Sequence, residues 1–168
     1  MLKIEHLTKV YSNGKKAVDD LSLIVEPGDI YGFIGANGAG KTSTIKSIVG
    51  IHDFDKGEIY ICGHSIRKEP LLCKKKMAFL PDNPDLYKNL TARQFLDFVA
   101  DIYRVSMEKR QAAIEKYSKM FELNTSLDQL ISSYSHGMKQ RLALIAALLH
   151  EPELLILDEP FVGLDPKG

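Results

Sequence analysis

Residues 34–44 read Ile-Gly-Ala-Asn-Gly-Ala-Gly-Lys-Thr-Ser-Thr. The stretch fits the pattern G-x-x-x-x-G-K-S/T, and the fixed positions are Gly35, Gly40, Lys41 and Thr42. A loop rich in glycine lets successive backbone N–H groups turn inward on an anion, and a helix that follows adds the positive end of its dipole. The stretch therefore predicts a loop that binds phosphate.

The residues on either side of this loop have the hydrophobic patterns of the strand and the helix that the motif requires. Residues 30–34 form a short apolar run that suits a buried strand, and the apolar residues of 44–49 repeat at helical spacing. The alternative is a coincidental glycine-rich turn, which a chain of this composition contains by chance about once in a hundred cases. We therefore expect Lys41 to reach the outer phosphates of a nucleotide and Thr42 to hold Mg²⁺.

The composition limits the class of protein. The 168 residues include 22 basic and 22 acidic side chains, so no overall field favours nucleic acid or an anionic membrane. Cys62 and Cys73 have neither metal-ligand spacing nor a paired framework, which predicts two reduced side chains. No apolar run reaches membrane-spanning length and the first residues do not read as a signal peptide, so we expect any membrane role to require a partner.

The first half of the chain reads mainly as strands joined by turns. Strands are predicted at 2–7, 18–25, 58–62 and 77–80, with turn signals at 12–14 and 81–84. A basic cluster comprises Arg67, Lys68 and Lys74 to Lys76. We interpret it as a solvated face, with a docking patch as the alternative, and assign it no function.

The second half reads mainly as helices. Thr91 and Gln94 have the spacing of a capping box, and a second helix carries Ile114, Tyr117 and Phe121. Residues 85–133 are therefore predicted to be a helical insert between strands. Residues 138–150 predict a further helix that is buried, and residues 154–157 predict a parallel strand covered on both faces.

Polar residues flank these last two elements. Asp158 and Glu159 follow the strand at its carboxyl end, where one carboxylate can reach Mg²⁺ and the other can deprotonate a water for attack on a terminal phosphate. The alternative for Asp158-Glu159-Pro160 is the start of a helix. Ser135 also has two interpretations: an N-cap or, with the free N–H groups around Gly137, a second anion site.

This order of elements closely resembles the nucleotide-binding domain of ATP-binding cassette (ABC) transporters along the whole chain. The matching segments are residues 35–42 (Walker A), 134–138 (signature motif), 154–158 (Walker B) and 163–165 (D-loop). The sequence of residues 79–82 and 134–138 is most similar to that of the subgroup that powers ABC-2-type exporters. The resemblance implies an α/β P-loop NTPase fold with a RecA-like core and an antiparallel β subdomain in residues 1–84 and 134–168, incomplete at the C-terminus, and an inserted helical subdomain in residues 85–133.

The resemblance also implies roles for individual residues. Tyr11 is similar to the family's adenine-stacking aromatic, Thr42 and Asp158 to its Mg²⁺ ligands, and Glu159 to its general base. Ser135 and Gly137 would contact the nucleotide of a second copy, so that two domains close head to tail around two ATP molecules. The expected catalytic residues are Glu159 and Lys41. The expected nucleotide-binding residues are Tyr11, Gly35, Asn37, Gly38, Ala39, Gly40, Lys41, Thr42, Ser43, Asp82, Ser135, Gly137 and Asp158.

The chain departs from the family pattern in three places. Asp82 stands where the family usually has a longer Gln that touches Mg²⁺. His136 takes a position that is often Gly, and we expect its ring to point outward, because backbone N–H groups bind there. The family's switch histidine follows the D-loop and is absent from these residues, so we expect the front part of a longer subunit, with impaired ATP turnover.

The function implied by the resemblance is that of the ATP-binding and ATP-hydrolysing subunit of an ABC exporter, with ATP and Mg²⁺ as cofactors. Its partners would be a transmembrane permease subunit and a second nucleotide-binding domain, at the cytoplasmic face of the cell membrane, and no nucleic acid. The alternative is an ABC-type ATPase that acts on DNA or ribosomes, although the long coiled coils or tandem cassettes usual in that class are not visible here. A small-molecule kinase would leave Ser135 and Asp165 unexplained.

Overall fold

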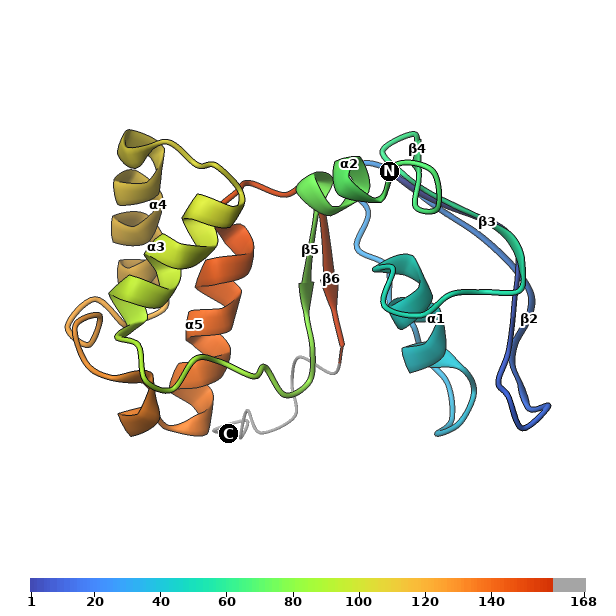
Figure 1. Cartoon of the computed structure of the whole chain (residues 1–168), viewed down its shortest axis with the longest axis horizontal. Coiled ribbons are helices and arrows are strands. Elements are labelled where there is room, and N and C mark those ends of the chain that lie inside the picture. The colour runs from blue at the N-terminus through green and yellow to red at the C-terminus, as the bar shows by residue number, and fades with distance from the viewer. Residues whose placement is uncertain (159–168) are drawn as a thin grey trace. The chain divides into compact units, whose positions relative to one another are not determined.

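A computed structural model describes residues 1–158 of the chain (Figure 1). The chain divides into two compact units, Met1–Met77 and Ala78–Gly168, and each is described by itself. None of the helices within the described residues is both long enough and apolar enough to cross a membrane.

The first unit is built on an antiparallel sheet of four strands in the order β2-β1-β3-β4. The strands are β1 (Leu2–Val10), β2 (Lys16–Val25), β3 (Lys56–Ile61) and β4 (His64–Ser65). Leu2 pairs with Ile61 and Ile4 with Ile59, and all four side chains are buried because alternate residues of a strand face the same side. The strands predicted at 2–7, 18–25 and 58–62 are confirmed, as is the turn at 12–14.

Two helices accompany this sheet. Helix α1 (Lys41–Ile48) buries Thr44, Ile45, Ser47 and Ile48 on one side, as the helical spacing predicted. Helix α2 (Pro70–Lys76) has Pro70 in its first turn, where the missing N–H of proline costs no hydrogen bond. No sequence pattern predicts α2, because its one buried side chain, Cys73, gives no periodic signal.

The strand predicted at 30–34 is wrong. These residues form no strand, and Ile30 and Ile34 are almost fully exposed. A strand needs a neighbour that accepts and donates its backbone hydrogen bonds, and no neighbour pairs with this run among the described residues. The apolar composition of the run was therefore insufficient to predict its conformation.

The second unit combines a short parallel sheet with helices. Strands β5 (Met77–Leu80) and β6 (Leu154–Leu157) run in the same direction side by side (Figure 1). The helices are α3 (Ala92–Ile102), α4 (Met107–Met120), η1 (Ile131–Ser133, a 3₁₀ helix) and α5 (His136–Leu148). Their shared core includes Leu96, Ile114, Leu123, Leu142 and Ile145. The buried helix predicted at 138–150 is confirmed, and it begins two residues earlier.

The helix ends in this unit follow the predicted capping chemistry. Gln94 donates its backbone N–H to the Thr91 hydroxyl, and Thr91 donates its own N–H to the Gln94 side chain at 2.9 Å, which confirms the capping box. Helix α4 is capped by Ser106. Arg110 of α4 pairs with Asp97 and Asp101 of α3, which joins the two helices.

Strand β6 is less buried than the sequence predicted. Leu154 is buried, but Leu155 and Leu157 are 38% and 37% exposed. The prediction assumed a strand inside a wide sheet with helices on both faces. Within the described residues β6 has one neighbouring strand, β5, so this prediction of burial on both faces is wrong.

Candidate functional site

The glycine-rich loop ends at a helix start whose backbone donors are not capped. Gly40 is the N-cap residue of α1, and no side chain accepts a hydrogen bond there. Its φ of 90° lies in the left-handed region, and a Cβ at this position would lie 2.1 Å from the carbonyl oxygen of Ala17. Glycine is therefore required here by both conformation and space. The first amides of α1 remain available to an anion.

Lys41 is folded onto the loop that precedes it. Its Nζ donates to the carbonyl oxygen of Gly35 at 2.6 Å and to that of Ala36 at 3.1 Å. The loop residues Asn37, Gly38 and Ala39 are exposed, and Gly38 also has a positive φ of 83°. The loop therefore combines a cation, uncapped amides and an open surface, which are the groups that a phosphate requires.

Tyr11 lies next to the first turn of α1. Its hydroxyl and the Ser43 hydroxyl form a hydrogen bond of 2.9 Å. Tyr11 is 36% exposed as a residue, and the Lys9 ammonium lies 5.6 Å from the centre of its ring. Thr42, the expected Mg²⁺ ligand, is exposed beside Ser43. The structure thus brings the predicted adenine-stacking residue to the phosphate loop.

His52 is a neighbour of this site that no sequence pattern predicts. Its ring meets the Tyr11 ring edge to face, with centroids 6.1 Å apart and planes at 87°. Its Nδ1 atom is buried and has no hydrogen-bond partner in the described part of the chain. An edge-to-face contact of this kind favours the observed orientation of the Tyr11 ring. No motif contains His52, so only the folded arrangement could identify it.

Asp82 and Asp158 lie at one edge of the sheet in the second unit. Asp158 directly follows β6, and its backbone N–H donates to the carbonyl oxygen of Leu80 at 2.9 Å. Leu80 is the last residue of β5, and the exposed Asp82 follows two residues later. The carboxyl ends of both strands therefore present a carboxylate. Glu159 and the D-loop (163–165) lie outside the described residues.

The signature segment forms the start of α5. The Met138 N–H donates to the Ser135 hydroxyl at 3.3 Å, which confirms the N-cap interpretation. Gly137 has open space where a Cβ would stand, and His136 is exposed as expected. Tyr134, unlike His136, is buried, and its hydroxyl donates to the Ser126 carbonyl at 2.7 Å. Burial and, more weakly, Asp128 raise the pKa of Tyr134.

The predicted site residues divide between the two units. Tyr11 and residues 35–43 belong to the first unit, and Asp82, Ser135, Gly137 and Asp158 belong to the second. No cluster of three or more His, Cys, Asp or Glu side chains suited to a metal occurs in residues 1–158. The expected Mg²⁺ ligands are one hydroxyl and one carboxylate, a set that Mg²⁺ accepts when substrate phosphates and water complete the shell.

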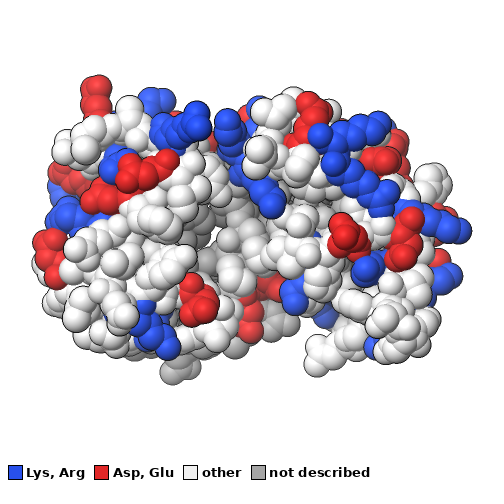
Figure 2. Space-filling model, in the orientation of Figure 1, with Lys and Arg blue, Asp and Glu red and all other residues white. Residues whose placement is uncertain are grey.

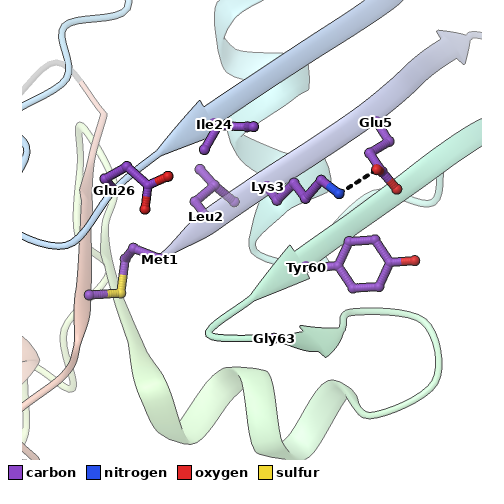
Figure 3. A pocket seen from close by; sticks show the side chains of 8 residues that line it. All are labelled: Met1, Leu2, Lys3, Glu5, Ile24, Glu26, Tyr60 and Gly63. Atoms are coloured by element: carbon purple, nitrogen blue, oxygen red, sulfur yellow. Dashed lines mark ion pairs between the residues drawn. The ribbon is translucent and has the colours of Figure 1, made fainter.

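An open pocket of about 440 Å³ lies elsewhere on the first unit (Figure 3). It is lined by residues of β1, β2 and β3 that include Ile24 and Tyr60. Its lysine, Lys3, forms an ion pair of 2.6 Å with Glu5, which raises the pKa of Lys3. None of the predicted site residues lines this pocket, and its charged side chains are exposed to water.

A comparison with known families identifies the chain. The profile of the ABC transporter family matches residues 18–162, which include the phosphate loop, the signature segment and the Walker B residues. The chain belongs to the ABC transporter family. The family predicted from the four motifs is thereby confirmed.

Curated relatives of this ABC chain are ATP-binding proteins. The bacitracin transport ATP-binding protein BcrA of Bacillus licheniformis is 42% identical over 168 residues, which cover 100% of this chain and 54% of BcrA. The linearmycin resistance ATP-binding protein LnrL of Bacillus subtilis is 39% identical over 172 residues, with 100% and 54% coverage. The chain therefore spans about half the length of these relatives.

Solved structures share the fold. The ATP-binding subunit of an ABC transporter superposes with a TM-score of 0.92 at 34% identity, covering 99% of this chain and 69% of that subunit. The ATP-binding cassette MJ0796, in a dimeric post-hydrolysis state bound to ADP and Pi, has a TM-score of 0.87 at 26% identity, with 99% and 77% coverage. The predicted P-loop NTPase fold with an antiparallel β subdomain is confirmed.

Proposed function

We propose that this ABC chain binds and hydrolyses ATP to drive a membrane exporter. The observation that carries the proposal is the phosphate loop, in which the Lys41 ammonium lies on the loop carbonyls beside the uncapped start of α1. A triphosphate offers the Lys41 ammonium anionic oxygens, whereas the backbone carbonyls offer it neutral ones. Lys41 would exchange its neutral carbonyl partners for phosphate oxygens, since a hydrogen bond between two ions adds the attraction of opposite charges.

Other residues of the first unit would bind different parts of the nucleotide. The uncapped amides at the start of α1 and the loop amides other than that of Ala39, which donates to the Ala36 carbonyl at 3.1 Å, would hold phosphate oxygens. The hydroxyls of Thr42 and Ser43 lie beside them. The Tyr11 ring stacks on the base, and its place next to Ser43 supports this assignment. Thr42 and Asp158 would hold Mg²⁺, which neutralises phosphate charge when bound.

Hydrolysis requires a group that takes a proton from water. We assign that role to Glu159 on the strength of its motif, because it directly follows Asp158 in the sequence. Asp82 at the end of β5 shares this edge with Asp158 and is assigned to the same nucleotide site. Lys41 stabilises the charge that develops on the transferred phosphate.

The partners follow from two open surfaces in the second unit. The first turn of α5, with Ser135 and Gly137, is open enough to meet the nucleotide of a second copy. An open pocket of about 350 Å³ is lined mainly by apolar side chains such as Phe95 and Val99 of α3, together with Asp85, Tyr103 and His150, and we assign it to a segment of a transmembrane subunit. The assignment to the inner face of the membrane rests on that partner.

The export role and the domain division remain part of this proposal. The names of BcrA and LnrL refer to bacitracin transport and linearmycin resistance, which support a transporter that removes compounds from the cell. We divide the chain into a core at 1–84 and 134–168 and a helical insert at 85–133. Helices α3 and α4 both lie inside the proposed insert, which supports that division.

The proposal is tested by MgATP affinity of the Lys41→Ala variant, measured by calorimetry. We expect a loss of about ten- to a hundredfold, because charge-assisted hydrogen bonds contribute about 1.5–3 kcal/mol. Lys46→Ala in the last turn of the same helix is the matched control and should bind normally. Equal affinity of Lys41→Ala and the unchanged chain would contradict the proposal.

A further inference from the structure

The neutral net charge of the chain conceals one strongly basic segment. Residues 67–76 contain five of the 22 basic side chains and only one of the 22 acidic ones. The remaining residues therefore carry a negative balance. In Figure 2, Lys and Arg side chains lie over the end of the first unit where Figure 1 draws α2 and β4. The sequence alone predicts no function for this segment.

Helix α2 is anchored on one side only. Its Cys73 side chain is buried, with Sγ 3.2 Å from the carbonyl oxygen of His64. The opposite side presents Leu71 and Leu72, which are 74% and 41% exposed. Helical geometry places Lys74 and Lys75 three and four residues after Leu71, on the same side. The exposed side of α2 is thus two leucines flanked by two lysines.

The lysine side chains at this face are available to bind a ligand. The side chains of Lys68, Lys74 and Lys75 have no hydrogen bond or ion pair within residues 1–158, and all three are exposed. Arg67 differs, because its guanidinium lies 3.8 Å from the Phe54 ring centre and donates to the Phe54 carbonyl. Glu69, the acidic residue of the segment, pairs with His64 at 3.2 Å.

We propose that the α2 face, defined as Lys68, Leu71, Leu72, Lys74 and Lys75, binds the anionic headgroups of a lipid bilayer. Lysines near a negatively charged membrane surface are attracted to it, and leucines between them enter the layer between headgroups and acyl chains. The lysine stems cover apolar surface while their ammonium groups stay at the headgroups.

The two leucines select this ligand over a nucleic acid. A phosphate backbone offers an electrostatic partner for the lysines but gives no favourable contact to an exposed aliphatic pair. An anionic bilayer satisfies both kinds of side chain at once. The proposal goes beyond the nucleotide site, because none of the α2 face residues belongs to that site.

The test is sedimentation of the chain with vesicles. The vesicles consist of phosphatidylcholine alone or of phosphatidylcholine with about one-third phosphatidylglycerol. We expect binding to the anionic vesicles only. Lys74→Gln with Lys75→Gln should weaken it about twenty-five-fold, since each lysine near an anionic surface contributes about fivefold. Leu71→Ser with Leu72→Ser should weaken it as well.

The control is Lys109→Gln with Lys116→Gln, which removes the same charge from exposed positions of α4. This variant should bind the anionic vesicles like the unchanged chain, and every variant should retain its circular dichroism spectrum and its affinity for MgATP. Equal binding to both kinds of vesicle would overturn the proposal. So would full binding by the leucine variant, because a purely electrostatic surface would then be sufficient.

Discussion

The starts of α1 and α5 use the same backbone groups in opposite ways. At α5 the Ser135 hydroxyl accepts the Met138 N–H, so part of the first turn is satisfied within the chain. At α1 the N-cap is Gly40, which has no side chain to offer, and the first amides stay free. Capping stabilises a helix by satisfying its orphan donors. Helix α1 therefore lacks this stabilisation, and its first backbone donors are available to a ligand.

Among substitutions at these helix starts, Gly40→Ala should have the largest effect. The new Cβ would meet the Ala17 carbonyl and force a positive φ on an alanine. We expect a loss of about 3 kcal/mol or more in the free energy of unfolding, measured by urea denaturation, together with loss of MgATP binding.

Gly38→Ala is the matched control for this substitution. It also imposes a positive φ, but nothing lies within 4 Å of its Cβ. It should cost only about 1–2 kcal/mol, the penalty of the conformation alone. Equal costs for the two variants would mean that the contact with Ala17 has no energetic weight.

A smaller effect is expected from Ser135→Ala. Removal of an N-cap hydroxyl costs about 1 kcal/mol of stability. Ser106→Ala removes the corresponding hydroxyl from α4 and should cost a similar amount. If Ser135 also contacts the nucleotide of a second copy, Ser135→Ala alone should reduce ATP-dependent dimerisation, measured by light scattering. Equal dimerisation by both variants would leave Ser135 with a capping role only and contradict the second-anion-site proposal.

The smallest effect concerns the pH dependence of the free energy of unfolding, through Tyr134 next to the start of α5. Because the folded state raises the pKa of Tyr134, the unfolded chain ionises this side chain near pH 10 while the folded chain keeps it neutral. The stability is therefore fully present below pH 10 and falls as the pH rises from the unfolded toward the folded pKa.

Tyr134→Phe should remove part of this alkaline loss, measured by denaturation midpoints at pH 9 and above. Some loss should remain, because burial also raises the pKa of Tyr103. An unchanged alkaline profile in Tyr134→Phe would show that this hydroxyl is equally accessible in the folded chain.

The sequence predicted the features that depend on neighbouring residues. The capping box of Thr91 and Gln94, the Ser135 cap and the glycine-rich loop are all set by side chains within a few positions of one another. The run 30–34 failed because pairing requires a distant strand, which composition does not reveal. His52 meets Tyr11 only after the chain folds, so no spacing predicted it.

The hairpin that carries Tyr11 contacts the phosphate loop at two points. The Tyr11 hydroxyl bonds to Ser43, and the Ala17 carbonyl faces Gly40 at a distance that admits no side chain. The amides of Tyr11 and Gly14 close the hairpin turn through bonds of 2.9 and 2.8 Å. Because the turn and the loop are joined, a nucleotide that immobilises one also immobilises the other. Deuterium uptake by these turn amides should therefore slow when only the phosphate end of the nucleotide is supplied, as inorganic triphosphate.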